Sequence, residues 1–143
     1  PEEADELKPF AAANGLDTVL LTAPTTDDKR LPAVLKYSSG FVYFVSVLGI
    51  TGTSSATEEA VRTHVERIKR HTKLPVGVGF GIRTPGQAAA VARHADAAVV
   101  GSAIVERVKA GLDDKGKAKP DLVPGVFAYI RALADGVRGV RKA

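Results

Sequence analysis

The chain has 143 residues, of which 45% are hydrophobic and 25% are charged, so it is long enough for one domain with a buried core. No apolar run reaches about 18 residues, so we expect no membrane span, and the absence of cysteine excludes disulfides and thiolate zinc sites and fits a cytoplasmic location. The net charge of +4 gathers in a polar loop at 115–119 and at the tail, without aromatic residues between the basic ones, so we expect no nucleic-acid partner.

The first predicted element is a helix over about residues 1–13. Pro1 suits a first helical turn, Leu7 and Phe10 supply an apolar stripe, and Asn14-Gly15 supplies a stop. The chain thus opens on a helix with no strand before it. We expect such a pattern from a segment that begins in the middle of a strand–helix repeat.

Short apolar runs then predict four strands, at residues 18–22, 41–46, 76–79 and 97–100. Helical patterns separate them. Asp27 or Asp28 caps the first of these helices, and Thr84 with Gln87 forms a capping box on the third. The apolar stripes expected to face the core are Leu31, Val34 and Leu35, then Val61, Val65 and Ile68, and then Ala88, Val91, Ala92 and Ala95.

A short helix from Ser102 to about Lys109 follows the last strand, and a polar loop at 113–119 leads to a final helix from about Val123. Alternating strands and helices predict the α/β class with a parallel sheet. An open doubly wound sheet and a closed barrel both fit this alternation. The dinucleotide fingerprint that would favour the open sheet is incomplete, because Ile82 stands where its third glycine belongs.

Glycine-rich ends of the third and fourth strands predict a phosphate site. Gly81 and Ile82 offer backbone amides after one strand, and Gly101 and Ser102 offer amides at the start of the short helix. The alternative is that these glycines only permit tight turns between strand and helix.

General acid–base chemistry lacks its usual groups at the predicted strand ends, which carry no carboxylate, histidine or lysine. Asp17 and Asp96 precede their strands, and we interpret Asp27, Asp28, Glu58 and Glu59 as helix-start acids. The histidines are His64, His71 and His94, whose spacing fits no metal pair. We also expect no well-placed carboxylate partner for them, and therefore no metal site.

A loop of glycines and small hydroxyl residues at 49–53 suits a lid over a substrate, or an ordinary long connection. Tyr43, in the strand before it, points either into a barrel or toward a helix, and an inward hydroxyl would need a partner.

Five stretches together resemble the tryptophan synthase α subunit family, in order and over essentially the whole chain. They are Leu20-Leu21-Thr22-Ala23-Pro24-Thr25, Gly40-Phe41-Val42-Tyr43, Gly49-Ile50-Thr51-Gly52, Pro75-Val76-Gly77-Val78-Gly79-Phe80-Gly81-Ile82 and Val100-Gly101-Ser102-Ala103-Ile104-Val105.

The resemblance implies a (βα)8 TIM barrel that cleaves indole-3-glycerol phosphate to indole and glyceraldehyde 3-phosphate by a retro-aldol reaction in tryptophan biosynthesis. It implies a β-subunit partner, in a complex of two α and two β subunits, which holds the pyridoxal phosphate, so this chain should hold no cofactor. By position, the residues implied to bind substrate or phosphate are Tyr43, Thr51, Gly52, Phe80, Gly81, Ile82, Gly101 and Ser102, with Tyr43 facing the substrate and Thr51 in the closing lid.

The catalytic carboxylates of that family lie on its second strand and the loop after it, and this chain has no counterpart of either. Residues 1–143 are therefore expected to form the C-terminal half of the barrel, about strands five to eight, as a single segment with no catalytic residue of its own. Two hypotheses follow: a part of a lyase that is inactive alone, or a non-catalytic half-barrel that binds phosphate or a partner and self-associates through open sheet edges.

Overall fold

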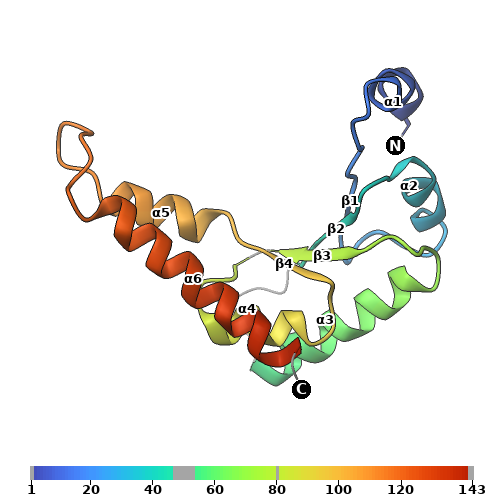
Figure 1. Cartoon of the computed structure of the whole chain (residues 1–143). Helices are drawn as coiled ribbons and strands as arrows, with labels where there is room; N and C mark the ends of the chain where they lie inside the picture. The colour runs from blue at the N-terminus through green and yellow to red at the C-terminus, as the bar shows by residue number, and fades with distance from the viewer. Residues whose placement is uncertain (1, 47–53, 80, 142–143) are drawn as a thin grey trace.

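The computed structural model describes residues 2–46, 54–79 and 81–141 (Figure 1). Within them the elements follow in the order α1 (Ala4–Ala13), β1 (Leu21–Thr22), α2 (Leu31–Tyr37), β2 (Val42–Val45), α3 (Ser54–Lys69), β3 (Val76–Gly79), α4 (Pro85–Ala92), β4 (Ala97–Val99), α5 (Ser102–Ala110) and α6 (Leu122–Arg141). No helix in these residues is both long enough and apolar enough to cross a membrane.

The strands form one parallel sheet in the order β1-β2-β3-β4. This confirms the predicted α/β class, because parallel neighbours require a helical crossover between them. The strands are shorter than expected at one edge. The first pairs only through Leu21 and Thr22, and Thr18 instead exchanges hydrogen bonds with Ser39.

The two faces of the sheet differ in what covers them. Val42, Phe44, Val76 and Val78 are buried under the helices. Side chains alternate along a strand, so the residues between them in sequence lie on the other face. That face carries no helix in the described residues, and it is where a closed barrel would have its interior.

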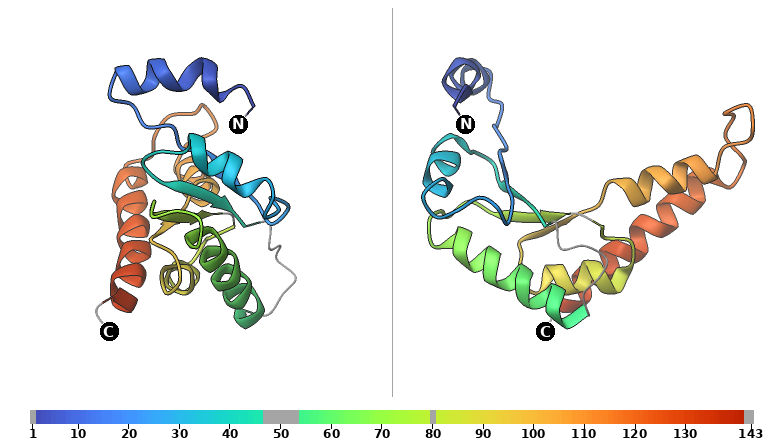
Figure 2. Two further views of the ribbon diagram at one scale, coloured as in Figure 1. Left: turned by 90° about the vertical axis from the view of Figure 1, so that its right-hand side faces the viewer. Right: turned by 180° about the vertical axis from the view of Figure 1, so that it is seen from behind.

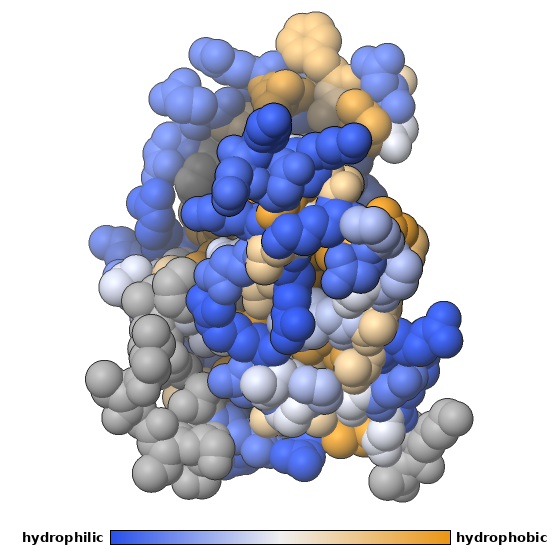
Figure 3. All heavy atoms as spheres, turned by 90° about the vertical axis from the view of Figure 1, so that its left-hand side faces the viewer, coloured by the Kyte–Doolittle hydropathy of each residue, from blue (hydrophilic) through white to orange (hydrophobic). Residues whose placement is uncertain are grey.

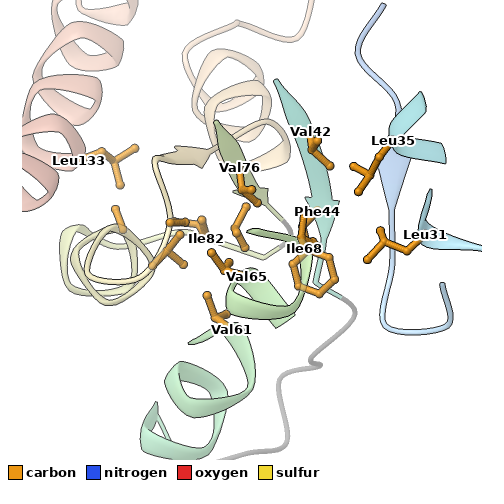
Figure 4. Close-up of a cluster of buried hydrophobic side chains, with 14 residues drawn as sticks. Leu31, Leu35, Val42, Phe44, Val61, Val65, Ile68, Val76, Ile82 and Leu133 are labelled. Carbon is orange, nitrogen blue, oxygen red and sulfur yellow. The ribbon is translucent and has the colours of Figure 1, made fainter. Parts of the chain in front are cut away.

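The core lies between the sheet and the helices that cover it. Figure 4 shows it running from Leu31 and Leu35 on α2, through the strands and α3, to Leu133 on α6. The stripes of α2, α3 and α4 predicted from sequence are all buried. The predicted capping box is also present, since Thr84 Oγ1 accepts from Gln87 N and Gln87 Oε1 accepts from Thr84 N.

Helices α5 and α6 extend past the end of β4, and α6 then returns along α4 (Figures 1 and 2). Gly136 permits this return, because a Cβ at that position would lie 2.5 Å from the backbone oxygen of Pro85. The loop between the two helices faces the viewer as a hydrophilic surface in Figure 3, and Asp113 organises it by accepting hydrogen bonds from the amides of Lys115 and Lys117.

Helix α1 is present and ends at Asn14-Gly15 as predicted, but its apolar stripe is not packed. No residue of α1 is buried, and Leu7 and Phe10 are 65% and 71% exposed. The helix stands apart from the sheet (Figure 1) and is attached by polar contacts, in which Lys8 Nζ donates to Lys36 O and Tyr37 Oη donates to Asp5 Oδ2. Its apolar stripe has no apolar surface to pack against in the described residues.

Candidate functional site

The carboxyl ends of β3 and β4 lie side by side because the two strands pair in register. Gly79 is opposite Val99 in this ladder. Neighbouring strands are about 4.8 Å apart, so two residues further along each chain the loops that contain Gly81 and Gly101 leave the sheet next to each other. The register therefore brings together the two glycine-rich tips that the sequence singled out.

The loop after β3 combines an anchored side chain with unused backbone donors. Ile82 is 7% exposed and belongs to the core, while Gly81 adopts φ +74° and no atom of the described residues would lie within 4 Å of a Cβ added to it. The amides of Gly81 and Ile82 donate to no other described residue. Backbone amides without a protein acceptor can serve as donors to an anion.

The start of α5 supplies the second set of donors. The carbonyl of Gly101 accepts from Ile104 N and Val105 N at 2.9 and 3.2 Å, which fixes the first helical turn. The amides of Gly101 and Ser102 precede that turn and donate to no other described residue. Unpaired amides and the positive end of the helix dipole favour an anion there.

Tyr43 lies on the face of the sheet opposite the helices, which decides between the two orientations left open by the sequence. Its side chain covers Gly79, where an added Cβ would be 2.6 Å from Tyr43 Oη. The ring therefore leans along the sheet toward the end of β3. The Tyr43 side chain is half-buried, and its hydroxyl lies beside Gly79, the last residue of β3.

Three of the site residues implied by the resemblance, Thr51, Gly52 and Phe80, lie outside the described residues, as does the 49–53 loop. Their predicted roles as lid and pocket residues stay predictions.

The acidic residues lie only partly where the sequence placed them. Asp96 Oδ2 accepts from Val76 N at 2.7 Å, at the opposite end of the sheet from the glycine tips, as predicted. The predicted cap of α2 by Asp27 or Asp28 is wrong: Asp27 Oδ1 accepts from Arg30 N in the turn before the helix, whereas the N-cap residue is Arg30, no side chain caps it and the first turn of α2 holds no acid. Glu58 and Glu59 are not helix-start acids either, because α3 begins at Ser54 and places them in its second turn. None of the described strand ends carries a carboxylate.

The expectation that no carboxylate lies near the histidines is wrong for one of them. Glu58 Oε1 is 3.0 Å from His94 Nε2, and its other oxygen is 3.0 Å from Arg93. Hydrogen bonding from His94, followed by Arg93, holds the pKa of Glu58 below its ordinary value. His64 packs on Phe44, with ring centroids 5.0 Å apart, and burial lowers its pKa. The described part of the chain contains no group of three metal-ligating side chains.

Sequence reasoning missed a contact beside the glycine tips, the ion pair between Arg83 and Glu106. The partners are 23 residues apart on different elements, and no local pattern connects them. The sequence hints at this pair only through the positions of the two residues: Arg83 follows the glycine-rich end of β3, and Glu106 lies one turn into α5, the helix that starts after the end of β4.

Comparison with known proteins assigns this arrangement to a family. The family model described as tryptophan synthase alpha chain matches residues 1–126. The chain belongs to the tryptophan synthase alpha chain family. Among curated relatives, the tryptophan synthase alpha chain of Acidiphilium cryptum is 53% identical over 142 residues, which are 99% of this chain and 51% of that protein. The one from Granulibacter bethesdensis is 54% identical over 140 residues, with 98% and 50% covered.

Solved structures of tryptophan synthase share the fold. A structure of the Mycobacterium tuberculosis enzyme matches with a TM-score of 0.78 and 37% identity, over 96% of this chain and 48% of that one. Subunit alpha from Legionella pneumophila str. Paris matches with a TM-score of 0.79 and 29% identity, over 97% and 49%. The chain thus spans about half the length of these tryptophan synthase alpha relatives, and its four parallel strands are about half of a (βα)8 barrel. That this half is the C-terminal half of the barrel, and that residues 1–143 form a single segment of it, stay predictions.

Proposed function

We propose that this chain is the phosphate-binding part of a tryptophan synthase α chain that cleaves indole-3-glycerol phosphate to indole and glyceraldehyde 3-phosphate. Membership of the family supports the reaction. The observation that carries the binding role is the pairing of β3 with β4. It sets the amides of Gly81 and Ile82 beside those of Gly101 and Ser102, and none of these four donates to a described residue.

The described residues suit the two ends of such a substrate. The phosphate would accept hydrogen bonds from the amides of Gly81, Ile82, Gly101 and Ser102, and the dipole of α5 would favour its negative charge. Tyr43 would contact the rest of the substrate on the helix-free face, where its hydroxyl lies over Gly79. Thr51, Gly52 and Phe80 would complete the pocket.

The bond-breaking step needs groups beyond those at the described strand ends. Retro-aldol cleavage requires a group to exchange protons with the indole ring and another to take the proton of the glycerol hydroxyl. Backbone amides and a tyrosine bind and orient, but they do not supply this pair of carboxylates. We infer that the carboxylates come from the other half of the barrel and that this chain alone binds substrate without turning it over.

The same proposal covers partner, cofactor and location. A tryptophan synthase β subunit would receive the indole and hold the pyridoxal phosphate, so this chain would bind no cofactor. A cytoplasmic location agrees with a biosynthetic lyase and with the absence of cysteine.

Binding can be measured directly, because the chain contains no tryptophan and the indole fluorescence of the ligand has no tryptophan background. We expect saturable binding of indole-3-glycerol phosphate that inorganic phosphate competes away. The variant Gly101→Ala should weaken binding at unchanged thermal stability, since nothing in the described structure lies within 4 Å of the added methyl group.

Turnover is tested by indole release, with and without a polypeptide corresponding to the first half of the Acidiphilium cryptum relative. We expect release only with both halves present. Rapid release by this chain alone would refute the assignment of the chemistry to the other half.

A second candidate, a non-catalytic half-barrel that self-associates, is favoured by unpaired apolar surface. Leu21 on the outer strand β1 is 58% exposed, and Val123 and Phe127 on α6 are 56% and 64% exposed. Solution scattering over a concentration series tests it. A monodisperse monomer at high concentration would exclude self-association.

A further inference from the structure

The loop after β3 and helix α5 are joined directly by a two-pronged ion pair. Arg83 Nη2 lies 2.9 Å from Glu106 Oε1, and Arg83 Nη1 contacts the other carboxylate oxygen. Parallel hydrogen bonds of this kind fix direction as well as distance. The guanidinium and the carboxylate therefore hold their two elements in one relative orientation.

Further contacts fix the backbone of Arg83 itself. Its amide donates to Gln87 Oε1 at 2.8 Å, and its carbonyl accepts from Tyr129 Oη at 2.7 Å. Tyr129 is packed partly against the core, and the Arg107 guanidinium stacks 4.6 Å from its ring centroid. Residues of α4, α5 and α6 thus converge on a single loop residue.

This residue lies between the two proposed sets of phosphate donors. Arg83 directly follows Ile82, and Glu106 is about one helical turn after Ser102. A tie between Arg83 and Glu106 therefore limits how far the amides after β3 can move from the amides at the start of α5.

The energetics argue against a role in global stability. The Arg83 and Glu106 side chains are 57% and 53% exposed, and ion pairs exposed to this extent contribute little to the free energy of folding. Hydrogen bonding to Arg83 lowers the pKa of Glu106, so the pair stays charged near neutrality. A contact that stabilises the fold weakly but defines a local orientation is suited to positioning.

We propose that Arg83, Glu106 and Tyr129 are positioning residues that hold the loop after β3 against α5, so that both sets of amides face one phosphate group. The inference rests on the proposed phosphate site and adds side chains that do not themselves bind the ligand. The alternative is that Arg83 binds phosphate with its own charge and that Glu106 merely competes for it.

The variant Glu106→Gln separates these two roles. It removes the partner of Arg83 and one negative charge near the site. If Arg83 were a direct ligand, its release would strengthen phosphate binding. If the pair positions the loop, binding weakens although the site has become more positive.

The experiment measures the Kd of inorganic phosphate and of indole-3-glycerol phosphate for the unchanged chain and for Glu106→Gln, Tyr129→Phe and the charge-swapped double variant Arg83→Glu/Glu106→Arg. We expect each single variant to raise Kd about fivefold, which corresponds to about 1 kcal/mol, and the swapped pair to recover most of the affinity. Tyr129→Phe is informative because it removes one hydroxyl and changes no charge.

The matched control is Asp135→Asn. It breaks an exposed ion pair with Arg138 within α6, with the same change in charge as Glu106→Gln. Its Kd should not change. Thermal unfolding of every variant should stay within a degree or two of the parent, whereas a purely structural role would lower the melting temperature and the affinity together.

The outcomes are distinct. Unchanged affinity in Glu106→Gln and Tyr129→Phe, or tighter binding in Glu106→Gln, overturns the positioning role and leaves the phosphate site intact. Absence of phosphate binding by the unchanged chain overturns the proposed function and the positioning role together.

Discussion

A methyl group added at Gly79 should destabilise the chain much more than one added at Gly77, although both glycines lie on the same strand and face. A Cβ at Gly79 would lie 2.6 Å from Tyr43 Oη and 2.9 Å from the backbone oxygen of Val99. Carbon contacts are favourable only at about 3.5–4.0 Å. The tyrosine can turn aside, but the oxygen of Val99 belongs to the neighbouring strand and cannot move without it.

At Gly77 the three described atoms nearest to the same methyl group all belong to side chains. Phe41 Cε2 and Val99 Cγ2 are each 3.3 Å away, and both lie on the face without helices, where they can shift. Neither glycine has a positive φ, so alanine is compatible with the backbone at both positions.

The magnitudes follow from these contacts. Overpacking costs about 1–3 kcal/mol, and replacing glycine by alanine at a compatible position recovers about 0.4–1 kcal/mol from the unfolded chain. Gly79→Ala should therefore lower the free energy of unfolding by about 1–2 kcal/mol. Gly77→Ala should change it by less than about 0.5 kcal/mol.

Urea unfolding followed by far-ultraviolet circular dichroism measures both variants. With a denaturant slope of about 2 kcal/mol per molar urea, the midpoint of Gly79→Ala should fall by about 0.5–1 M relative to that of Gly77→Ala. Equal midpoints for the two variants would refute the reasoning, because they would mean that neither Tyr43 nor the Val99 backbone restricts position 79.

Three further predictions concern stability and its dependence on pH. Thr84→Ala should cost about 1 kcal/mol of unfolding free energy through loss of the capping box, whereas Thr84→Ser should cost little. The folded-state pKa of Glu58 is lowered by its contact with His94, so its contribution to stability is present above the ordinary pKa of about 4.3 and is lost as the pH falls below it. The urea midpoint of Glu58→Gln should accordingly change less between about pH 5 and about pH 3 than the midpoint of the parent chain. An equal change of the midpoint with pH in both proteins would contradict this. Burial lowers the pKa of His64, so the unfolded chain binds its proton more readily and stability should fall as the pH drops through about 6.5, an effect that His64→Phe should remove.

Local features were predicted well from the sequence. The capping box at Thr84, the stop at Asn14-Gly15 and the limits of the third strand were all correct, because each depends on hydrogen bonds or conformations within a few residues. The buried stripes of α2, α3 and α4 were also correct, since a helix between parallel strands must turn its apolar side to the sheet.

Features that depend on a distant partner were predicted poorly. Leu7 and Phe10 have the spacing of a packed stripe but no apolar surface against them in the described residues. Glu58 pairs with His94 across 36 residues, and its position in the second turn of α3 became evident only from the structure. The candidate site shows the same division, because the glycine tips were visible in the sequence and the ties between them were not.

The sequence by itself determined the alternation of strands and helices, the glycine-rich tips and the resemblance to the family, since these are written in local patterns and motif order. Only the tertiary structure decided that Tyr43 covers Gly79 on the helix-free face and that Arg83 meets Glu106 beside the amides. The physical reason is that strand register and helix packing set these contacts, and both result from the whole core rather than from neighbouring residues.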